Sequence, residues 1–156
     1  MKRVFWLLIG LTLLAGCQKP VEPVVEGFTY SDCTKGDSDP DDPIDLSLLT
    51  LRYEGGNLQV TRTDAWLNCS FQNRGLVCTV SVKGSDIYYR VDYEKEGAEV
   101  KCVCLVSNLS SVVRGLETGK KYSFHYYCCQ NYKPFTITCN EGMITVLDVS
   151  TITINQ

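Results

Sequence analysis

The sequence has little of what enzymatic sites are built from. It holds one histidine, His125, and no G-x-S-x-G, P-loop or H-E-x-x-H motif marks a nucleophile, a phosphate-binding loop or a zinc protease site. A lone histidine on a strand is typical of a surface position, and Glu94 and Glu96 fall at a turn where water solvates charge. We therefore expect a non-enzymatic protein with no catalytic residue and no cofactor.

Basic clusters are also missing. The whole chain of 156 residues has a formal net charge of −3. Without Lys2 and Arg3 the remainder carries 13 basic and 18 acidic residues, a net charge of −5. No Lys/Arg stripe is present to follow a phosphate backbone or to bind anionic lipid, so we expect no nucleic-acid partner. Membrane attachment, if any, has to come from a lipid.

Such an anchor is predicted at the N-terminus. Lys2 and Arg3 precede an apolar run from Val4 to Ala15, which is too short to span a bilayer and is typical of an export signal. The run closes on Leu14-Ala15-Gly16-Cys17, which resembles a bacterial lipobox. That resemblance implies removal of residues 1–16 and lipidation (palmitate among the acyl chains) of Cys17. Gln18 after the cysteine is compatible with an outer-membrane lipoprotein facing the periplasm or the outside.

Composition divides the remainder into two parts. Residues 17–46 contain Pro20, Pro23, Pro40 and Pro43 and an acidic run at 37–42, so we expect an extended tether. Residues 47–156 are expected to form the folded domain. Their dominant period is two, in short apolar-alternating runs separated by Gly, Asn and Asp turns, and no window shows a helical period. The expected runs are 49–53 and 58–60 as a hairpin across Gly55-Gly56, then 76–82, 87–93, 98–106, 122–129, and 135–139 paired with 143–149.

This pattern predicts an all-β fold, an antiparallel sandwich or barrel. The segment Gly115-Leu116-Glu117-Thr118-Gly119-Lys120-Lys121-Tyr122 resembles the tyrosine corner of immunoglobulin-like and fibronectin type III domains. The resemblance implies an immunoglobulin-like β-sandwich in which Leu116, Gly119 and Tyr122 form a structural corner. The hydroxyl of Tyr122 would then bond to upstream backbone. Inward positions are expected for Tyr122, Phe124, Tyr126 and Cys128, and outward ones for Ser123, His125, Tyr127 and Cys129.

A wider resemblance supports the compartment. The segments 51–60, Leu67-Asn68-Cys69, Cys102-Val103-Cys104 and 115–122 are similar to small cysteine-containing lipoproteins of Bacteroides-type bacteria. Many members have a second cysteine after the Asn-Cys pair, where this chain has Ser70. The resemblance implies a fold and a cell-envelope location, and it implies no activity.

Cysteines are the strongest compositional signal. Beyond Cys17 their number is even, which in an exported domain favours a disulfide framework. Zinc would prefer C-x-x-C spacing or histidine partners, and the chain has neither, so we expect no metal. The disulfide candidates are Cys33, Cys69, Cys78, Cys102, Cys104, Cys128, Cys129 and Cys139.

The pairing is open, since eight cysteines allow 105 connectivities. We expect one of Cys102 and Cys104 to pair with Cys128, and Cys69 to pair with Cys78. Cys33 is expected to pair with Cys129 or Cys139, fastening the tether to the domain. The alternative is a thiolate site for metal or redox chemistry built from Cys102, Cys104, Cys128 and Cys129.

Tyrosines supply the remaining candidate surface. Tyr88, Tyr127 and Tyr132 fall on parities or turns that leave them partly exposed, and Trp66 is close to Cys69. Partly exposed tyrosines on a rigid framework are used to bind proteins or glycans, although they also occur on sheets for β-propensity alone. The leading hypothesis is a membrane-anchored lipoprotein with a binding or scaffolding role. The protein or glycan it binds is open.

Overall fold

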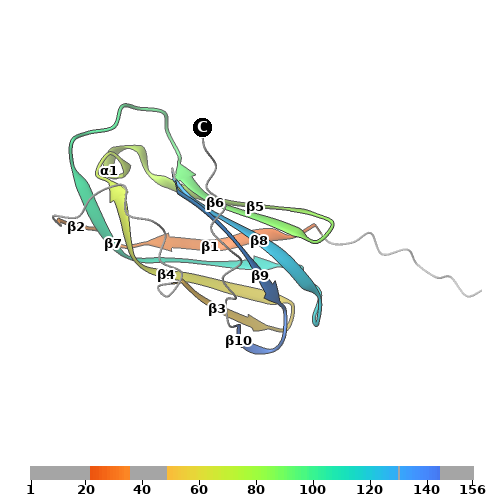
Figure 1. Cartoon of the computed structure of the whole chain (residues 1–156). Helices are drawn as coiled ribbons and strands as arrows, with labels where there is room; N and C mark the ends of the chain where they lie inside the picture. Colours follow the sequence, from red (N-terminus) through yellow and green to blue (C-terminus); the bar gives the residue numbers. More distant parts are fainter. Residues whose placement is uncertain (1–21, 36–48, 130, 145–156) are drawn as a thin grey trace, which may run out of the picture.

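The computed structural model describes residues 22–35, 49–129 and 131–144 (Figure 1). Residues 1–16, Cys17 and the part of the expected tether at 36–46 lie outside these ranges. Within them the chain forms short strands and one helix of a single turn. The elements are β1 Val24–Tyr30, β2 Cys33–Lys35, β3 Leu49–Glu54, β4 Asn57–Asn68, α1 Phe71–Arg74, β5 Leu76–Lys83, β6 Asp86–Tyr93, β7 Val103–Arg114, β8 Lys121–Cys128, β9 Asn131–Thr138 and β10 Gly142–Ile144.

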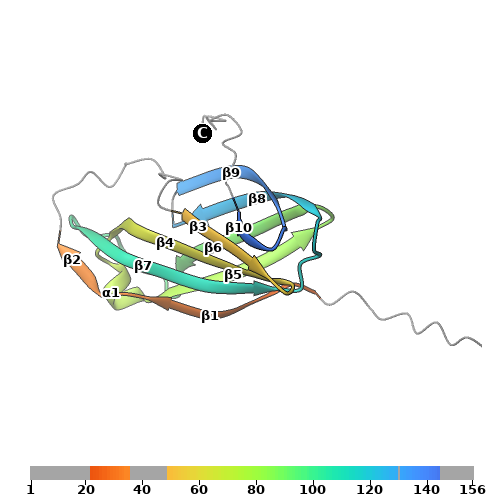
Figure 2. The same ribbon diagram turned by 90° about the horizontal axis from the view of Figure 1, so that it is seen from below.

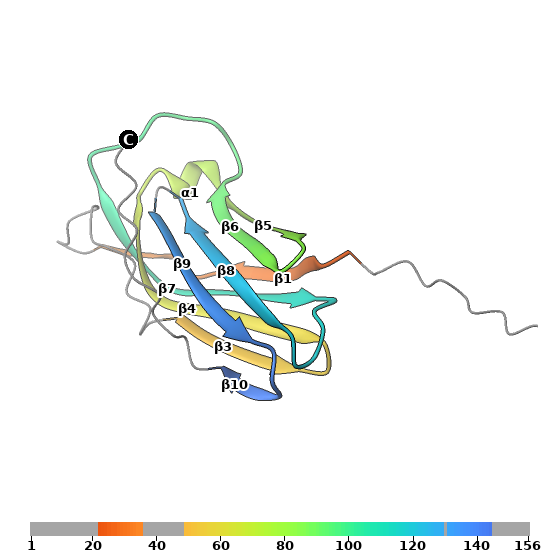
Figure 3. The same ribbon diagram turned by 45° about the vertical axis from the view of Figure 1, so that its right-hand side comes forward.

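The strands form two sheets, so the all-β fold expected from the sequence is confirmed. One sheet has the order β1-β7-β4-β3-β10, with β2 also paired to β7, and the other has the order β5-β6-β8-β9. Figures 1 and 3 show the two sheets as separate layers, and Figure 2 shows β7, β4 and β3 in front of the second layer. In the described part of the chain no helix is long and apolar enough to cross a bilayer.

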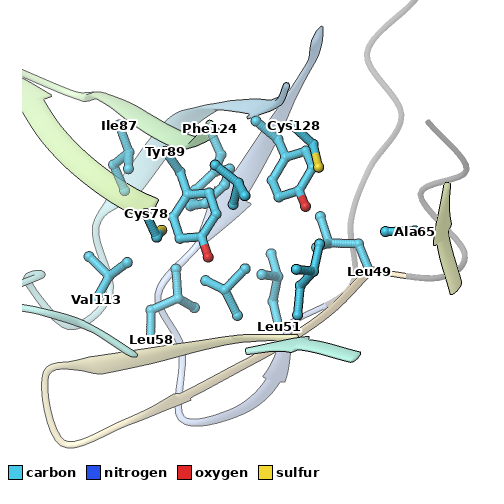
Figure 4. Packing of buried hydrophobic residues seen from close by; sticks show 14 of the residues in the cluster. Leu49, Leu51, Leu58, Ala65, Cys78, Ile87, Tyr89, Val113, Phe124 and Cys128 are labelled. Carbon is cyan, nitrogen blue, oxygen red and sulfur yellow. The ribbon is translucent and has the colours of Figure 1, made fainter. Parts of the chain in front are cut away.

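The core lies between the layers. Alternation places Leu51 and Leu58 on the inner face of the first sheet and Ile87, Tyr89 and Phe124 on that of the second, and none of them is more than 2% exposed. Figure 4 shows these side chains pointing toward one another from the two sheets. Burying such apolar area is the main favourable contribution to folding, at about 25 cal/mol per Å².

The inward parity of β4 changes once along its length. Leu58, Val60 and Arg62 point inward, and beyond them the buried positions become Ala65 and Leu67. Asp64, with φ +51°, lies at the change. A residue in the left-handed region breaks strict alternation, so both halves of this long strand can present side chains to the core. Arg62 precedes the break and lies on the buried side by ordinary alternation.

Most strand pairs are antiparallel, and the β6–β8 pair is the exception. Tyr88 lies beside His125 and Arg90 beside Tyr127 in a parallel register. Parallel neighbours need a crossover connection. Here the chain leaves β6, passes through β7 in the other sheet, and returns in β8.

Three expectations about the elements are corrected. Residues 24–35 of the expected tether form β1 and β2, which pair along β7, so this part of the tether belongs to the first sheet. The expected run 98–106 begins at 103 and continues to 114 as β7. The expected hairpin of 135–139 with 143–149 is wrong over its described residues, because β9 pairs with β8 and β10 pairs with β3 in the other sheet.

The corner at Tyr122 has the hydrogen bond expected of it. The backbone N–H of Glu117 donates to the Tyr122 hydroxyl, with 3.2 Å between nitrogen and oxygen. Leu116 is buried, and Gly119 has φ +76°, a turn conformation that glycine adopts without strain. Tyr53, on β3, reaches the same corner and donates from its hydroxyl to the carbonyl of Leu116 at 2.9 Å. Sequence reasoning assigned no such role to Tyr53.

Candidate binding face

The outer face of the four-stranded sheet carries a row of aromatic side chains. We call Tyr88, His125, Tyr132 and Tyr127 the aromatic ladder. Tyr88 comes from β6, His125 and Tyr127 from β8, and Tyr132 from β9, at positions that alternate with core residues. Register brings them together, because Tyr88 lies beside His125 and Tyr127 lies opposite Tyr132.

The rings of the ladder stack on one another. Ring centroids are 4.6 Å apart for Tyr88 and His125, 6.1 Å for His125 and Tyr132, and 4.4 Å for Tyr127 and Tyr132, with interplanar angles of 10°, 5° and 26°. Within the pairs Tyr88–His125 and Tyr127–Tyr132, the ring faces are therefore turned toward each other. A ligand on this surface meets edges, hydroxyls and neighbouring charges rather than an open ring face.

A cation stands at each end of the ladder. The Nζ of Lys83 is 5.7 Å from the Tyr88 centroid, and the guanidinium carbon of Arg90 is 4.7 Å from the Tyr127 centroid. Such cation–π contacts contribute about 0.5–1 kcal/mol at exposed sites. Two carboxylates accompany these cations: Asp92 pairs with Arg90, with 3.2 Å between nitrogen and oxygen, and Asp86 contacts His125.

His125 is held by partners at both ring nitrogens. Its Nε2 is 3.0 Å from Oδ1 of Asp86, and its Nδ1 is 2.8 Å from the Tyr132 hydroxyl. With a neutral ring, Nε2–H donates to the carboxylate and Nδ1 accepts from the hydroxyl. Burial raises the pKa of Tyr132, and the neighbouring Tyr127 raises it further. This shift is opposite to that of an activated nucleophile, so the arrangement orients the ladder and does not favour covalent chemistry.

Sequence analysis named the four ladder residues without connecting them. His125 was treated as an ordinary surface residue, and Trp66, grouped with the tyrosines, lies half-buried on β4 in the other sheet. The roles of Asp86, Lys83 and Arg90 were missed. The parallel register of β6 and β8 brings these residues together, and no local sequence pattern predicts that register.

The outer face of the other sheet has a shallow polar depression of about 410 Å³. Its charged side chains form exposed ion pairs, Arg52 with Glu54 at 3.7 Å and Arg114 with Glu26 at 2.9 Å. Such pairs contribute little stability, and none of the residues that line the depression is aromatic, so the ladder is the stronger candidate. The depression is lined by Arg52, Glu54, Asn57, Gln59, Val112 and Arg114.

Two disulfides lie close together near the start of β7. Cys33 bridges to Cys104 and Cys69 bridges to Cys102, each with Cα atoms 5.3 Å apart. The sulfurs of Cys33, Cys69 and Cys104 lie within 4.8 Å of one another. A bridge from Cys33 to the domain was expected and is present, but every expected partner was wrong. The pairing of β2 and β4 with β7 decides the partners, because it places their cysteines beside 102–104.

The other four candidates are thiols, which corrects the expectation of eight bridged cysteines. Burial raises the pKa of Cys78 and of Cys139 to about 11. Cys128 and Cys129 follow one another at the end of β8. Of the alternative set, Cys102 and Cys104 are thus held in disulfides, while Cys128 and Cys129 remain available as thiols. The one group of metal-ligand atoms found among the described residues includes neither Cys128 nor Cys129.

Comparisons with protein-family models, with curated proteins and with solved structures find no match to this chain.

Proposed function

We propose that the chain is a membrane-anchored, non-enzymatic binding module that uses the aromatic ladder as its contact surface. The lipobox-like segment at Cys17 supports attachment to the outer membrane. The observation that carries the proposal is the group of four aromatic side chains on the outer face of the four-stranded sheet, in which two stacked pairs are joined by the His125–Tyr132 hydrogen bond and Lys83 and Arg90 contact Tyr88 and Tyr127. Tyr and Arg are the residue types most enriched at the energetic centres of protein interfaces.

The ladder favours a protein partner over a glycan. Sugar rings bind tyrosine by lying on an open ring face, and here Tyr88 and Tyr127 are each in contact with a neighbouring ring and with a cation, Lys83 or Arg90. Ring edges and hydroxyls between two cations suit a polar protein surface with acidic side chains. The partner we propose is an envelope protein with such an acidic patch.

Photocrosslinking in intact cells tests this proposal. A photoreactive phenylalanine analogue at Tyr88 is expected to give a discrete adduct with one envelope protein, and Arg90→Glu in the same chain is expected to abolish it. The same analogue at Arg52, on the opposite sheet, is the matched control and should give no such adduct. Equal adducts at both positions, or none at Tyr88, would contradict the proposal.

A glycan array with the purified chain separates the two partner classes. Binding to a defined glycan that is lost in Tyr127→Ala would replace the protein partner with a sugar while keeping the surface. Binding that survives Tyr127→Ala would move the site away from the ladder.

A further inference from the structure

Arg62 is a buried cation without a carboxylate. Its residue is 6% exposed on the inner side of β4, and its guanidinium carbon is 5.9 Å from the centroid of the Tyr126 ring. Its Nε is buried and lacks a hydrogen-bond partner, and none of the ion pairs found among the described residues includes Arg62. A guanidinium keeps its proton in proteins, so burying it calls for a negative group nearby.

Cys128 can supply this negative group. It is 1% exposed and faces the same part of the core as Arg62 and Tyr126. Hydrogen bonding from Cys129 lowers the pKa of the Cys128 thiol, burial opposes this, and the charge of Arg62 lowers it further. Asp92 is the charged neighbour that acts in the opposite direction. A thiolate at Cys128 would neutralise the otherwise uncompensated charge of Arg62.

The backbone conformation of Cys129, the residue after Cys128, is unusual. Cys129 has φ +54°, a conformation that non-glycine residues rarely adopt, and its N–H donates to the carbonyl of Val91 at 2.7 Å. Successive strand residues normally point to opposite faces, but the backbone leaves the extended conformation directly after Cys128. The Cys128 thiol is the largest influence on the pKa of Cys129, and it raises that pKa. Cys129 is only partly buried, so it connects the buried pair to the surface. The two thiols influence one another, so the pKa of Cys128 is lowered and that of Cys129 is raised.

We propose that Cys128 and Cys129 form a redox-active dithiol that exchanges with disulfides of small thiols or proteins, with Arg62 as its buried counter-ion. In the first step the Cys129 sulfur attacks the external disulfide and passes its proton to Cys128. A mixed disulfide forms on Cys129, and the first external thiolate leaves. Cys128 then attacks the Cys129 sulfur and passes its proton to the second external sulfur, which departs as a thiol. The first external thiolate takes its proton from water. The dithiol is oxidised, and the external disulfide is reduced to two thiols.

The product is expected to be easily reduced again. Cα atoms of adjacent residues are about 3.8 Å apart, whereas unstrained disulfides span about 4.4–6.8 Å. Strained disulfides have higher reduction potentials and are the labile, regulatory or catalytic ones. The pair is thus suited to a reversible cycle, unlike the two bridges near β7, which join separate strands or loops.

Reaction with oxidised glutathione tests the proposal on the full chain. The chain is purified without reductant, incubated with oxidised glutathione, alkylated and digested. We expect the peptide with Cys128 and Cys129 to lose two hydrogens and to take no alkyl group on either sulfur. Cys128→Ser should stop at a glutathione adduct on Cys129. Cys78→Ser, which removes a separate buried thiol, should react like the wild type.

The role of Arg62 is measured through the pH profile of the reaction. Arg62→Met should slow it about tenfold near neutral pH and move the profile to higher pH, because an adjacent opposite charge is worth one or more pKa units. Arg62→Lys, which keeps the charge, should recover most of the rate, and circular dichroism verifies the fold of each variant. A wild-type peptide that stays a dithiol in excess oxidised glutathione would overturn the proposal. Folded Arg62→Met with an unchanged rate and pH profile would remove Arg62 from it.

Discussion

Two tyrosine hydroxyl groups stabilise the corner at residues 115–122, which connects β7 of one sheet to β8 of the other. The Tyr122 hydroxyl accepts from the N–H of Glu117, and the Tyr53 hydroxyl donates to the carbonyl of Leu116 and lies 2.9 Å from Oγ1 of Thr118. Both tyrosines are 3% exposed or less, so water cannot easily replace a lost partner. The corner is therefore sensitive to the loss of one oxygen atom.

We predict that Tyr122→Phe lowers the free energy of unfolding by about 1–2 kcal/mol, because it leaves the Glu117 N–H unpaired near the core. Urea denaturation measures the change. Tyr88→Phe, which removes a hydroxyl from the outer face, is the matched control and should have a smaller effect. If both variants lost the same free energy of unfolding, the hydrogen bond between Tyr122 and Glu117 would contribute no more to stability than a hydroxyl on the outer face.

Because of the buried thiols Cys78 and Cys139, the free energy of unfolding should change with pH in the alkaline range. Their pKa is about 11 in the folded chain, against about 9 when exposed. The unfolded chain therefore loses these protons first as the pH rises. The free energy of unfolding should fall between about pH 9 and pH 11, with no contribution from these thiols below pH 9.

Chemical denaturation across that pH range measures the slope. Replacing both thiols, in the variant Cys78→Val with Cys139→Val, should flatten it. Burial also raises the pKa of Tyr89 and Tyr126 in the folded chain, so these tyrosines lose their protons first in the unfolded chain and a residual slope is expected. A slope identical to that of the wild type would contradict the prediction.

Among the elements, β7 organises the first sheet. It pairs with β1, β2 and β4, and the two disulfides fix residues 102–104 at its start. The bridge Cys33–Cys104 spans 71 residues and Cys69–Cys102 spans 33. The longer loop loses more entropy in the unfolded chain when it is closed.

We predict that Cys33→Ser with Cys104→Ser costs about 4.4 kcal/mol, and that Cys69→Ser with Cys102→Ser costs about 3.7 kcal/mol. Urea midpoints under non-reducing conditions compare the two variants. The first should also expose β1 and β2 to proteolysis, because β2 then keeps only its three pairs with β7. A chain indifferent to loss of the Cys33–Cys104 bridge would show that β2 contributes nothing to the fold.

Alternation and turn residues carried most of the fold prediction. The hairpin across Gly55-Gly56 and the inward and outward positions of β8 follow from local pattern, which is why they were predictable. Which strands pair depends on residues that are far apart in the sequence. The parallel β6–β8 pair, the pairing of β10 with β3 and the cysteine pairing could therefore not be predicted from local pattern. The ladder was recognised as separate tyrosines, since only register shows that they stack.

At the scale of the whole molecule, we propose that the lipid anchor at Cys17 and the folded part are separable. None of the described residues forms a membrane-spanning helix, and the chain has no basic cluster that would bind anionic lipid. We therefore predict that Cys17→Ser moves the protein from the membrane fraction to the soluble envelope fraction without changing its unfolding transition. Fractionation with a salt wash measures this. A serine variant that remains with membranes after the wash would contradict the anchor.

The position of β1 sets how far the domain can stray from such an anchor. β1 begins at Val24, seven residues after Cys17, and a fully extended chain of that length reaches about 25 Å. That is comparable to the thickness of one small domain. The linker would therefore allow the domain to rotate but not to move far from the membrane. With this reach, a lipid-anchored domain would stay close to the bilayer surface. Only molecules that are themselves near that surface could then contact either of its two sheets.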